Sequence, residues 1–412
     1  PLSLVPTQDT IGHGTFLAGL SAGSSIPQED FTGAAPEAEL AVVKLKPAKK
    51  YLRDFYLIPS DAPAFQENDI MMGIKYLRMM ADRLKKPLVI LLAMGSNSGS
   101  HIGTSPLSQV TQNYSGFFGI ITVIACGNET GAAHHFYASI PAGTEYEDVE
   151  IRVGKEEAER GFVLELWAAD ADTYTVGFIS PSGERISRIP IIANNETSIP
   201  FLLDATTITV NYQLIEAESG SQLIFMRFQT PAAGIWTVRV YNTQRFKGTF
   251  HMWLPVQGMI SEETVFLRPD PYSTITVPGN SRLPITVGAY DTSTGGIYIH
   301  SSRGFTPNQI VKPELAAPGV NILGPSVGRK PGSDTPMTTR TGTSAAAAIT
   351  AGAAANLLGW GIVEGNYPTM SEASVKSYLI RGAQRNPALT YPNREFGYGT
   401  LDLFQTFLRL RE

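Results

Sequence analysis

Residues 342–352 of the chain read GTSAAAAITAG. A glycine precedes Ser344, and the residues that follow predict a helix built almost wholly from small side chains. The free amides and the dipole at a helix N-terminus favour negative charge, which suits a nucleophile and the oxyanion it generates. Small side chains also let such a helix pack tightly inside a protein. Taken alone, the stretch is better explained as a buried alanine-rich helix with a capping serine.

Two further stretches carry polar groups in exposed settings. Residues 12–19 read GHGTFLAG, which places His13 between two glycines at the start of a small-residue helix. Residues 121–129 read ITVIACGNE, so a buried strand ends in a glycine followed by Asn128. Ligand sites of open parallel sheets form at the carboxyl ends of strands, where an asparagine amide can stabilise a developing oxyanion. Taken by itself, the first stretch is more often explained by a structural histidine, and a turn asparagine is a common explanation of the second.

The composition of the 412 residues is that of an ordinary globular protein, with 43% hydrophobic and 17% charged residues. The net charge is −5 and basic residues are dispersed, so there is no electrostatic signature of nucleic-acid or anionic-membrane binding. A single cysteine excludes an intrachain disulfide. No uninterrupted apolar run is long enough to span a bilayer. The chain begins with Pro1 and without signal-peptide features, which leads us to expect a product of processing or truncation.

The hydrophobic pattern predicts three regions, 1–138, 139–268 and 269–412. In the first, continuous apolar strands (41–45, 88–93 and 120–125) alternate with predicted helices (67–84 and 104–115), which is typical of a parallel sheet covered on both faces. In the second, period-two alternation with frequent turns predicts an antiparallel sandwich, interpreted as a jelly roll. The third returns to the first pattern, with a strand at 283–289, a helix at 343–358 and a helix at 371–381 capped by Ser371.

Taken together and in this order, the three polar stretches resemble the subtilisin-like serine peptidases, or subtilases. Further matches lie along the predicted α/β regions, and they are residues 32–36, 92–96, 286–289, 317–320 and 396–402. The resemblance implies an α/β fold with a subtilisin-like parallel sheet and helices on both faces, here interrupted by an inserted all-β jelly-roll domain. It also implies a serine endopeptidase that needs no cofactor. Calcium is common in the family, but no acidic loop of this sequence indicates a calcium site.

The same resemblance assigns roles to individual residues. Ser344 corresponds to the nucleophile, His13 to the general base and Asn128 to the oxyanion donor. The backbone of Met94, Gly95 and Ser96 corresponds to the edge that binds an extended substrate.

The triad aspartate of the family has no counterpart in this sequence. Only twelve residues precede His13, and Asp9 lies in a stretch that resembles the loop before the histidine, so the orienting role is not assigned to it. Two explanations remain open. The aspartate strand belongs to a separate N-terminal segment or propeptide, as the absent initiator methionine favours, or the protein is a catalytically inactive pseudoprotease that acts as a binding or signalling protein.

The long insertion narrows the resemblance to the Csp-type subtilases of clostridia, which activate a cortex-lytic enzyme during spore germination. This implies limited proteolysis of a protein substrate and a location in the spore or outside the cytoplasm of a Gram-positive anaerobe. A broad-specificity secreted protease is the weaker alternative. His134 and His135 are adjacent, a spacing that does not direct both rings at one metal, and Cys126 is expected to be a small buried core residue.

Overall fold

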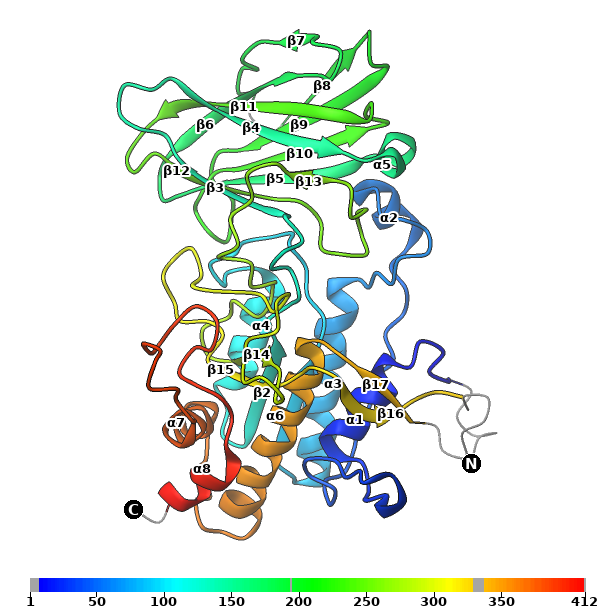
Figure 1. Cartoon of the computed structure of the whole chain (residues 1–412), viewed down its shortest axis with the longest axis vertical. Helices are drawn as coiled ribbons and strands as arrows, with labels where there is room; N and C mark the ends of the chain where they lie inside the picture. The colour runs from blue at the N-terminus through cyan, green and yellow to red at the C-terminus, as the bar shows by residue number, and fades with distance from the viewer. Residues whose placement is uncertain (1–6, 193–194, 329–336, 411–412) are drawn as a thin grey trace.

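The computed structural model describes residues 7–192, 195–328 and 337–410. The molecule has two parts along its long axis (Figure 1), an α/β part and, above it, two antiparallel sheets. The first α/β segment contains α1 (His13–Ala22), the 3-10 turn η1 (Pro27–Glu29), α2 (Lys50–Tyr56), α3 (Glu67–Leu84), β1 (Leu88–Leu92), α4 (Pro106–Ser115) and β2 (Ile120–Ala125). The second contains β14 (Ile285–Tyr290), β15 (Leu315–Pro318), β16 (Ile322–Pro325), β17 (Met337–Arg340), α6 (Thr343–Leu358), the π-turn η2 (Gly359–Val363), α7 (Glu372–Gly382) and α8 (Leu403–Arg409).

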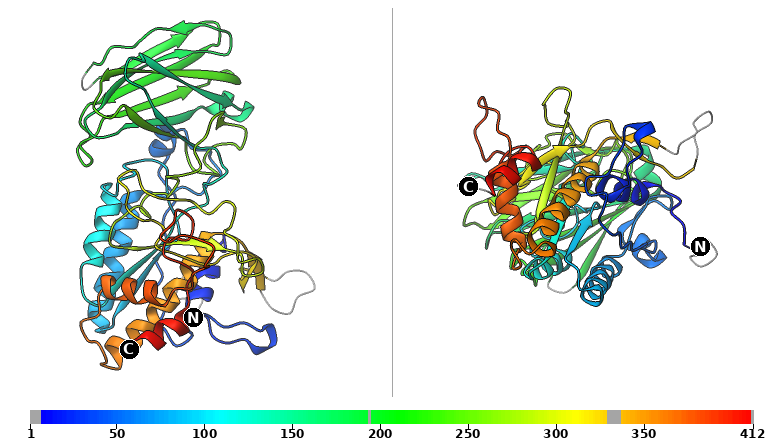
Figure 2. Two further views of the ribbon diagram at one scale, coloured as in Figure 1. Left: turned by 60° about the vertical axis from the view of Figure 1, so that its left-hand side comes forward. Right: turned by 90° about the horizontal axis from the view of Figure 1, so that it is seen from below.

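A parallel sheet in the order β1-β2-β14-β15 joins the two segments. Helices α3 and α4 pack on one face, over Ile120 and Ile124, while α6 and α7 pack on the other, over Ile121 and Val123. The two groups of helices lie on opposite sides of the sheet in the views of Figure 2. The expected parallel sheet with helices on both faces is therefore confirmed. Because each face of β2 meets a helix layer, all six of its residues are buried.

The prediction of a strand at 41–45 is wrong, because the structure has no strand there. These residues take no part in a sheet, and Val42 is 71% exposed. Val43 instead packs against Gly73 of α3. A strand needs a hydrogen-bonded neighbour, and within the described residues the sheet ends at β1, so the 41–45 segment has no partner there.

The helix predictions hold with shifted ends. Ser371 caps α7 by accepting a hydrogen bond from the Ser374 amide, as expected. In α4 the cap is Ser105, which begins the helix slightly later than predicted. The sequence contains no uninterrupted apolar run long enough to span a bilayer. Helix α6 together with η2 is nevertheless long and apolar enough to cross one, by length and composition alone. It is largely buried between the sheet and α1, which is the position of a core helix.

The region between β2 and β14 forms two antiparallel sheets around one core. The six-stranded sheet has the order β3-β12-β5-β10-β9-β8 and the five-stranded sheet the order β13-β4-β11-β6-β7. A short helix, α5 (Lys155–Arg160), lies between β4 and β5. The strands are β3 (His135–Ser139), β4 (Tyr146–Val153), β5 (Phe162–Ala168), β6 (Thr173–Ile179), β7 (Arg185–Ile186), β8 (Glu196–Phe201), β9 (Thr206–Gln213), β10 (Leu223–Gln229), β11 (Gly234–Gln244), β12 (Thr249–Trp253) and β13 (Val265–Phe266).

The six-stranded sheet is buried on both faces where it meets the α/β part. In β5, Phe162, Leu164 and Leu166 point into the sandwich core. The alternate residues Val163, Glu165 and Trp167 are also buried, although they lie on the opposite face. The α/β part covers this second face, for example where the Gly99 amide donates to Glu165.

Candidate active site

Ser344 lies in the first turn of α6 and is only partly buried. Gly342 directly precedes the helix and has a φ of 153°, which an L side chain rarely adopts. An ideal Cβ atom on Gly342 would lie 3.5 Å from the Asn128 amide nitrogen. The Ser344 hydroxyl lies 3.5 Å from the Ala93 carbonyl oxygen, just after β1. The nucleophile candidate thus stands at a helix N-terminus, as the sequence predicts, and it lies beside the end of a parallel strand.

Asn128 follows β2 and contacts the start of α6. Its side-chain oxygen accepts a hydrogen bond of 3.0 Å from the Thr343 amide. Since the oxygen is engaged, the amide nitrogen is the end that remains to donate. Gly127, with φ of 102°, makes the turn that carries Asn128 out of the strand. The structure therefore brings Asn128 close to Ser344, because Asn128 binds Thr343, the residue directly before Ser344.

His13 is the first residue of α1 and is half-buried. Gly12 precedes it with φ of 79° and offers no capping side chain. Asp9 supplies the cap instead: one carboxylate oxygen accepts from the Ile11 and Gly12 amides, and the other accepts from the amide and hydroxyl of Thr15. Both oxygens of Asp9 serve the helix end.

Helices α1 and α6 pack side by side and run in the same direction. Near their C-terminal halves, an ideal Cβ atom on Gly352 would lie 2.7 Å from the Ser21 carbonyl oxygen. At their beginnings, Arg340, which precedes α6, has its guanidinium over the Phe16 ring of α1. Ser21 lies eight residues after His13, and Gly352 lies eight residues after Ser344. Because every residue adds the same rise along a helix axis, His13 and Ser344 lie at the same height along these two neighbouring helices.

The electrostatic surroundings of His13 favour its neutral form. Burial lowers the pKa of His13 below its usual value, and the positive charge of Arg340 lowers it further, against a smaller opposing effect of Asp9. Partial burial alone would raise the pKa of Asp9, but its hydrogen bonds from Gly12, Thr15 and Ile11 outweigh this and lower it to about 2. A neutral imidazole is the form that a general base requires.

The segment Met94–Ser96 leaves β1 at the carboxyl edge of the sheet. Ser96 pairs with Val277 through both backbone groups, at 3.0 Å and 2.9 Å. Gly95 packs against Thr276, too closely for a side chain. The Ser96 amide, expected to bind an extended substrate, is therefore already engaged, so the backbone of Met94 and Gly95 is what the segment can offer to a substrate strand.

Sequence reasoning missed two residues of the site. Arg340 belongs to β17 and acts on His13 across the α1–α6 contact, and no motif marks it. Glu129 is 6% exposed, and its carboxylate lies near the Asn97 amide nitrogen, the His134 ring and the Gln257 amide. Its position directly after Asn128 is the signal that could have drawn attention to it.

The residues set aside in the sequence have other surroundings. His134 contacts Glu129, whereas His135 points to the Asp270 carbonyl oxygen and to His251. Among the described residues no group of three or more His, Cys, Asp or Glu side chains is arranged to hold a metal ion. Cys126 is buried, and burial raises the pKa of its thiol to about 12.

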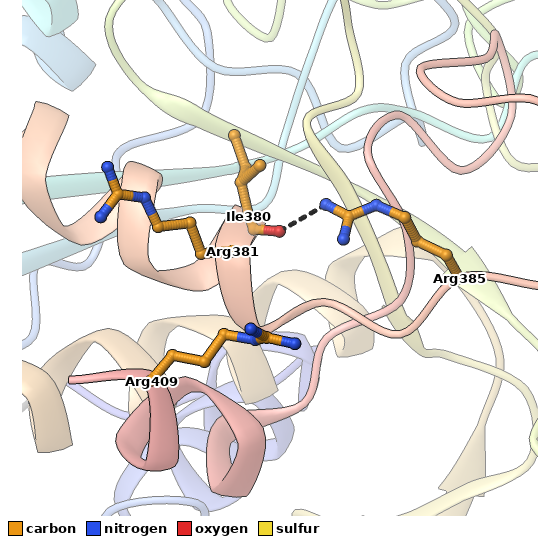
Figure 3. Close-up of a pocket in the computed structure, with 4 residues that line it drawn as sticks. All are labelled: Ile380, Arg381, Arg385 and Arg409. Carbon is orange, nitrogen blue, oxygen red and sulfur yellow. Dashed lines mark hydrogen bonds between the residues drawn. The ribbon is translucent and has the colours of Figure 1, made fainter. Parts of the chain in front are cut away.

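A cavity of about 440 Å³ lies elsewhere, lined by Ile380, Arg381, Arg385 and Arg409 (Figure 3). Arg385 donates hydrogen bonds to the Ile380 and Ala383 carbonyls at the end of α7, the usual role of a cation at a helix C-terminus. An adjoining cavity is lined by Trp360, which follows the C-terminal end of α6. These cavities therefore lie at the opposite end of α6 from Ser344.

Known proteins are similar to parts of this chain or to all of it. The Subtilase family model matches residues 268–399, which include Ser344. The structure of the Clostridium perfringens CspB protease is 29% identical, with a TM-score of 0.88, over 100% of this chain and 82% of that one. The prenylagaramide maturation protease PagA is 28% identical over 33% of this chain and 46% of its own, with a TM-score of 0.27. An S41 psychrophilic protease is 15% identical over 96% and 78%, with a TM-score of 0.46.

No curated protein matches the chain. The family match covers Ser344 but begins after His13 and Asn128, whereas the similarity to the CspB protease extends over all three residues. The chain thus contains a segment that matches the Subtilase family, and over its whole length it is similar to the CspB protease structure.

Proposed function

We propose that the protein is a serine endopeptidase in which Ser344 is the nucleophile, His13 the general base and Asn128 the oxyanion donor. The observation that carries the proposal is the level placement of His13 and Ser344 on two parallel, packed helices. The similarity to a subtilase structure supports the same reaction class.

The reaction follows from these positions. His13, neutral near pH 7, accepts the hydroxyl proton of Ser344 as the oxygen attacks a peptide carbonyl. The Asn128 amide nitrogen and the Ser344 amide in the first turn of α6 donate to the oxyanion that forms, since the Thr343 amide is bound to Asn128. His13 then returns the proton to the leaving amine, and water hydrolyses the acyl-enzyme by the same route.

The orienting aspartate is proposed to come from a strand that pairs with β1. Within the described residues, β1 has a sheet neighbour only on its β2 side, so its other edge offers unpaired backbone groups. The extended, exposed 41–45 segment lies without a strand partner as well. An N-terminal segment or propeptide that supplies this strand would also supply the carboxylate that fixes the His13 tautomer.

The finer expectations belong to the same proposal. They are limited cleavage of a protein substrate, activation of a spore cortex-lytic zymogen during germination, and a location in the spore or outside the cytoplasm. The division at 138 and 268 and the jelly-roll character of the inserted domain are proposed likewise, and the two-sheet sandwich supports them. A requirement for calcium or another cofactor is not part of the proposal.

Labelling with a serine-directed phosphonate tests the function. The protein as isolated from its source should form an adduct on Ser344, and Ser344→Ala should abolish it. Ser371→Ala, which removes a serine cap from a different helix, is the matched control and should label as the parent does. A parent protein that forms no adduct would reject the proposal.

The second candidate is a pseudoprotease that binds or signals. Asp9, whose charge acts on His13, uses both carboxylate oxygens to cap α1, which favours this alternative. An encoded sequence upstream of Pro1 without an aspartate strand, together with absent labelling, would establish it.

A further inference from the structure

The segment that follows the substrate edge is held by the antiparallel sandwich. Gly99 donates its amide to Glu165 of β5 at 3.0 Å, and the Asn97 side chain donates to the Leu254 carbonyl at 3.0 Å. The His101 ring stacks on Trp253 of β12, with centroids 3.7 Å apart and planes inclined by 2°. Residues 97–101 are thus anchored at three points, to β5, to β12 and to Leu254 directly after β12, all distant in sequence.

These anchors belong to one face of the six-stranded sheet. Trp253 pairs directly with Glu165 on β5 and with His135 on β3, so the three side chains form a row across the sheet. Glu165 is 5% and Trp253 2% exposed. Glu165 also accepts a hydrogen bond from the Trp167 indole, which fixes the direction of its carboxylate. The three side chains are buried, and packing and hydrogen bonds hold them in place, as a positioning surface requires.

The same part of the sandwich reaches the oxyanion side of the site. Just beyond β12, the Gln257 amide donates to Glu129, which directly follows Asn128. Glu129 also lies within hydrogen-bonding distance of His134. The segment from Trp253 to Gln257 therefore contacts both Asn97, which follows Ser96, and Glu129, which follows Asn128.

We propose that the sandwich positions the substrate edge of the protease, with Trp253 and Glu165 as the positioning residues. This inference rests on the proposed function. On one side the edge is pinned through Ser96 to Val277, and on the other through residues 97–101 to the sandwich. Ser344 and His13 are held separately, by the contact of α6 with α1. Disturbing the sandwich contact should therefore weaken the binding of extended substrates and leave the reactivity of Ser344 intact.

Trp253→Leu is the decisive variant because it removes the stacked ring and keeps an apolar side chain. The probes are a fluorogenic hexapeptide, selected from a peptide library with the parent protein, and a phosphonate without a peptide portion. We expect KM for the hexapeptide to rise about tenfold, because misplacement of about an ångström can cost up to about 100-fold. The rate of phosphonate labelling should stay within about twofold. Trp253→Phe should restore most of the affinity, and Glu165→Ala should act in the same direction as Trp253→Leu.

Trp236→Leu is the matched control. Trp236 is a fully buried tryptophan of the same sandwich, packed on Phe201 and Phe228 in its core. The variant should destabilise the sandwich without raising KM. An unchanged KM in folded Trp253→Leu, or an equal rise in Trp236→Leu, would overturn the inference.

Hydrogen exchange separates this inference from the proposed function. If the parent protein neither cleaves nor labels, the proposed function fails. Amide exchange over residues 97–101 then decides on positioning by itself. Faster exchange in Trp253→Leu but not in Trp236→Leu supports the sandwich contact as the element that orders the segment, and equal exchange in the two refutes it.

Discussion

The carbonyl oxygen of Ser21 faces Gly352 across the contact between α1 and α6, and an ideal Cβ atom on Gly352 would lie 2.7 Å from it. This approach requires glycine, because a side chain there would also meet Ala34. The contact fixes how far one helix slides along the other. It thereby fixes the relative height of His13 and Ser344, which lie eight residues earlier on each helix.

Gly352→Val should force α1 and α6 apart. We expect a loss of about 1–3 kcal/mol in the free energy of unfolding from overpacking, and a larger relative loss in the phosphonate labelling rate of Ser344. Urea unfolding and labelling kinetics measure the two effects. Gly359→Ala is the control, since a Cβ atom at Gly359 meets nothing within 4 Å. Labelling that survives Gly352→Val at the parent rate would contradict the role of this contact.

Arg340→Gln should raise the pKa of His13. The arginine charge is one of the causes that lower this pKa, so its removal favours the protonated imidazole, which cannot act as a base. The acid limb of the pH dependence of Ser344 labelling should move to higher pH. Arg340→Lys keeps the charge and should leave the limb near its original position. A limb that does not move in the glutamine variant would show that Arg340 has no electrostatic role.

Asp9→Ala should destabilise the start of α1. Loss of a capping carboxylate costs about 0.5–2 kcal/mol. The pKa of Asp9 in the folded protein is about 2, below its ordinary 3.8, so its contribution is present above about pH 4 and is lost as the pH falls toward 2. Thr15→Val removes only the hydroxyl bond to Asp9 and should cost less. Equal unfolding free energies of parent and Asp9→Ala at pH 7 would disprove the capping role.

The buried histidines of the interface should make stability depend on pH. Burial lowers the pKa of His101 and of His135 to about 4 from 6.5. Between these values the unfolded chain binds protons that the folded protein does not, so stability is complete above about pH 6.5 and falls as the pH drops toward 4. Burial raises the pKa of Glu165, which opposes this trend.

His101→Phe isolates the histidine contribution, since a phenyl ring can keep the stack on Trp253. Urea unfolding at several pH values should give a shallower fall between pH 6.5 and 4 than in the parent. His300→Gln, at a histidine outside this stack, is the control and should follow the parent. If the unfolding free energy of His101→Phe fell with pH as steeply as that of the parent, the pH dependence would arise from other groups.

Local sequence predicted much of the site. The glycine before Ser344 and the small residues after it mark a helix start, and the apolar run before Gly127 and Asn128 marks a strand end. Each signal is carried by neighbours within a few residues, where propensity and turn chemistry act. The 41–45 segment shows the limit of such patterns. Its apolar residues favour a strand, yet a strand also needs an edge to pair with, and pairing is not a local property.

The sequence by itself determined the chemical groups of this protein and the element ends that present them: Ser344 at a helix start, His13 between glycines and Asn128 after a strand. Only the tertiary structure decided which groups act on one another. Arg340 reaches His13, and Trp253 reaches His101, across separations of more than a hundred residues. Such contacts depend on how whole sheets and helix layers pack against one another. This packing produces no repeating pattern in the sequence from which the contacts could be predicted.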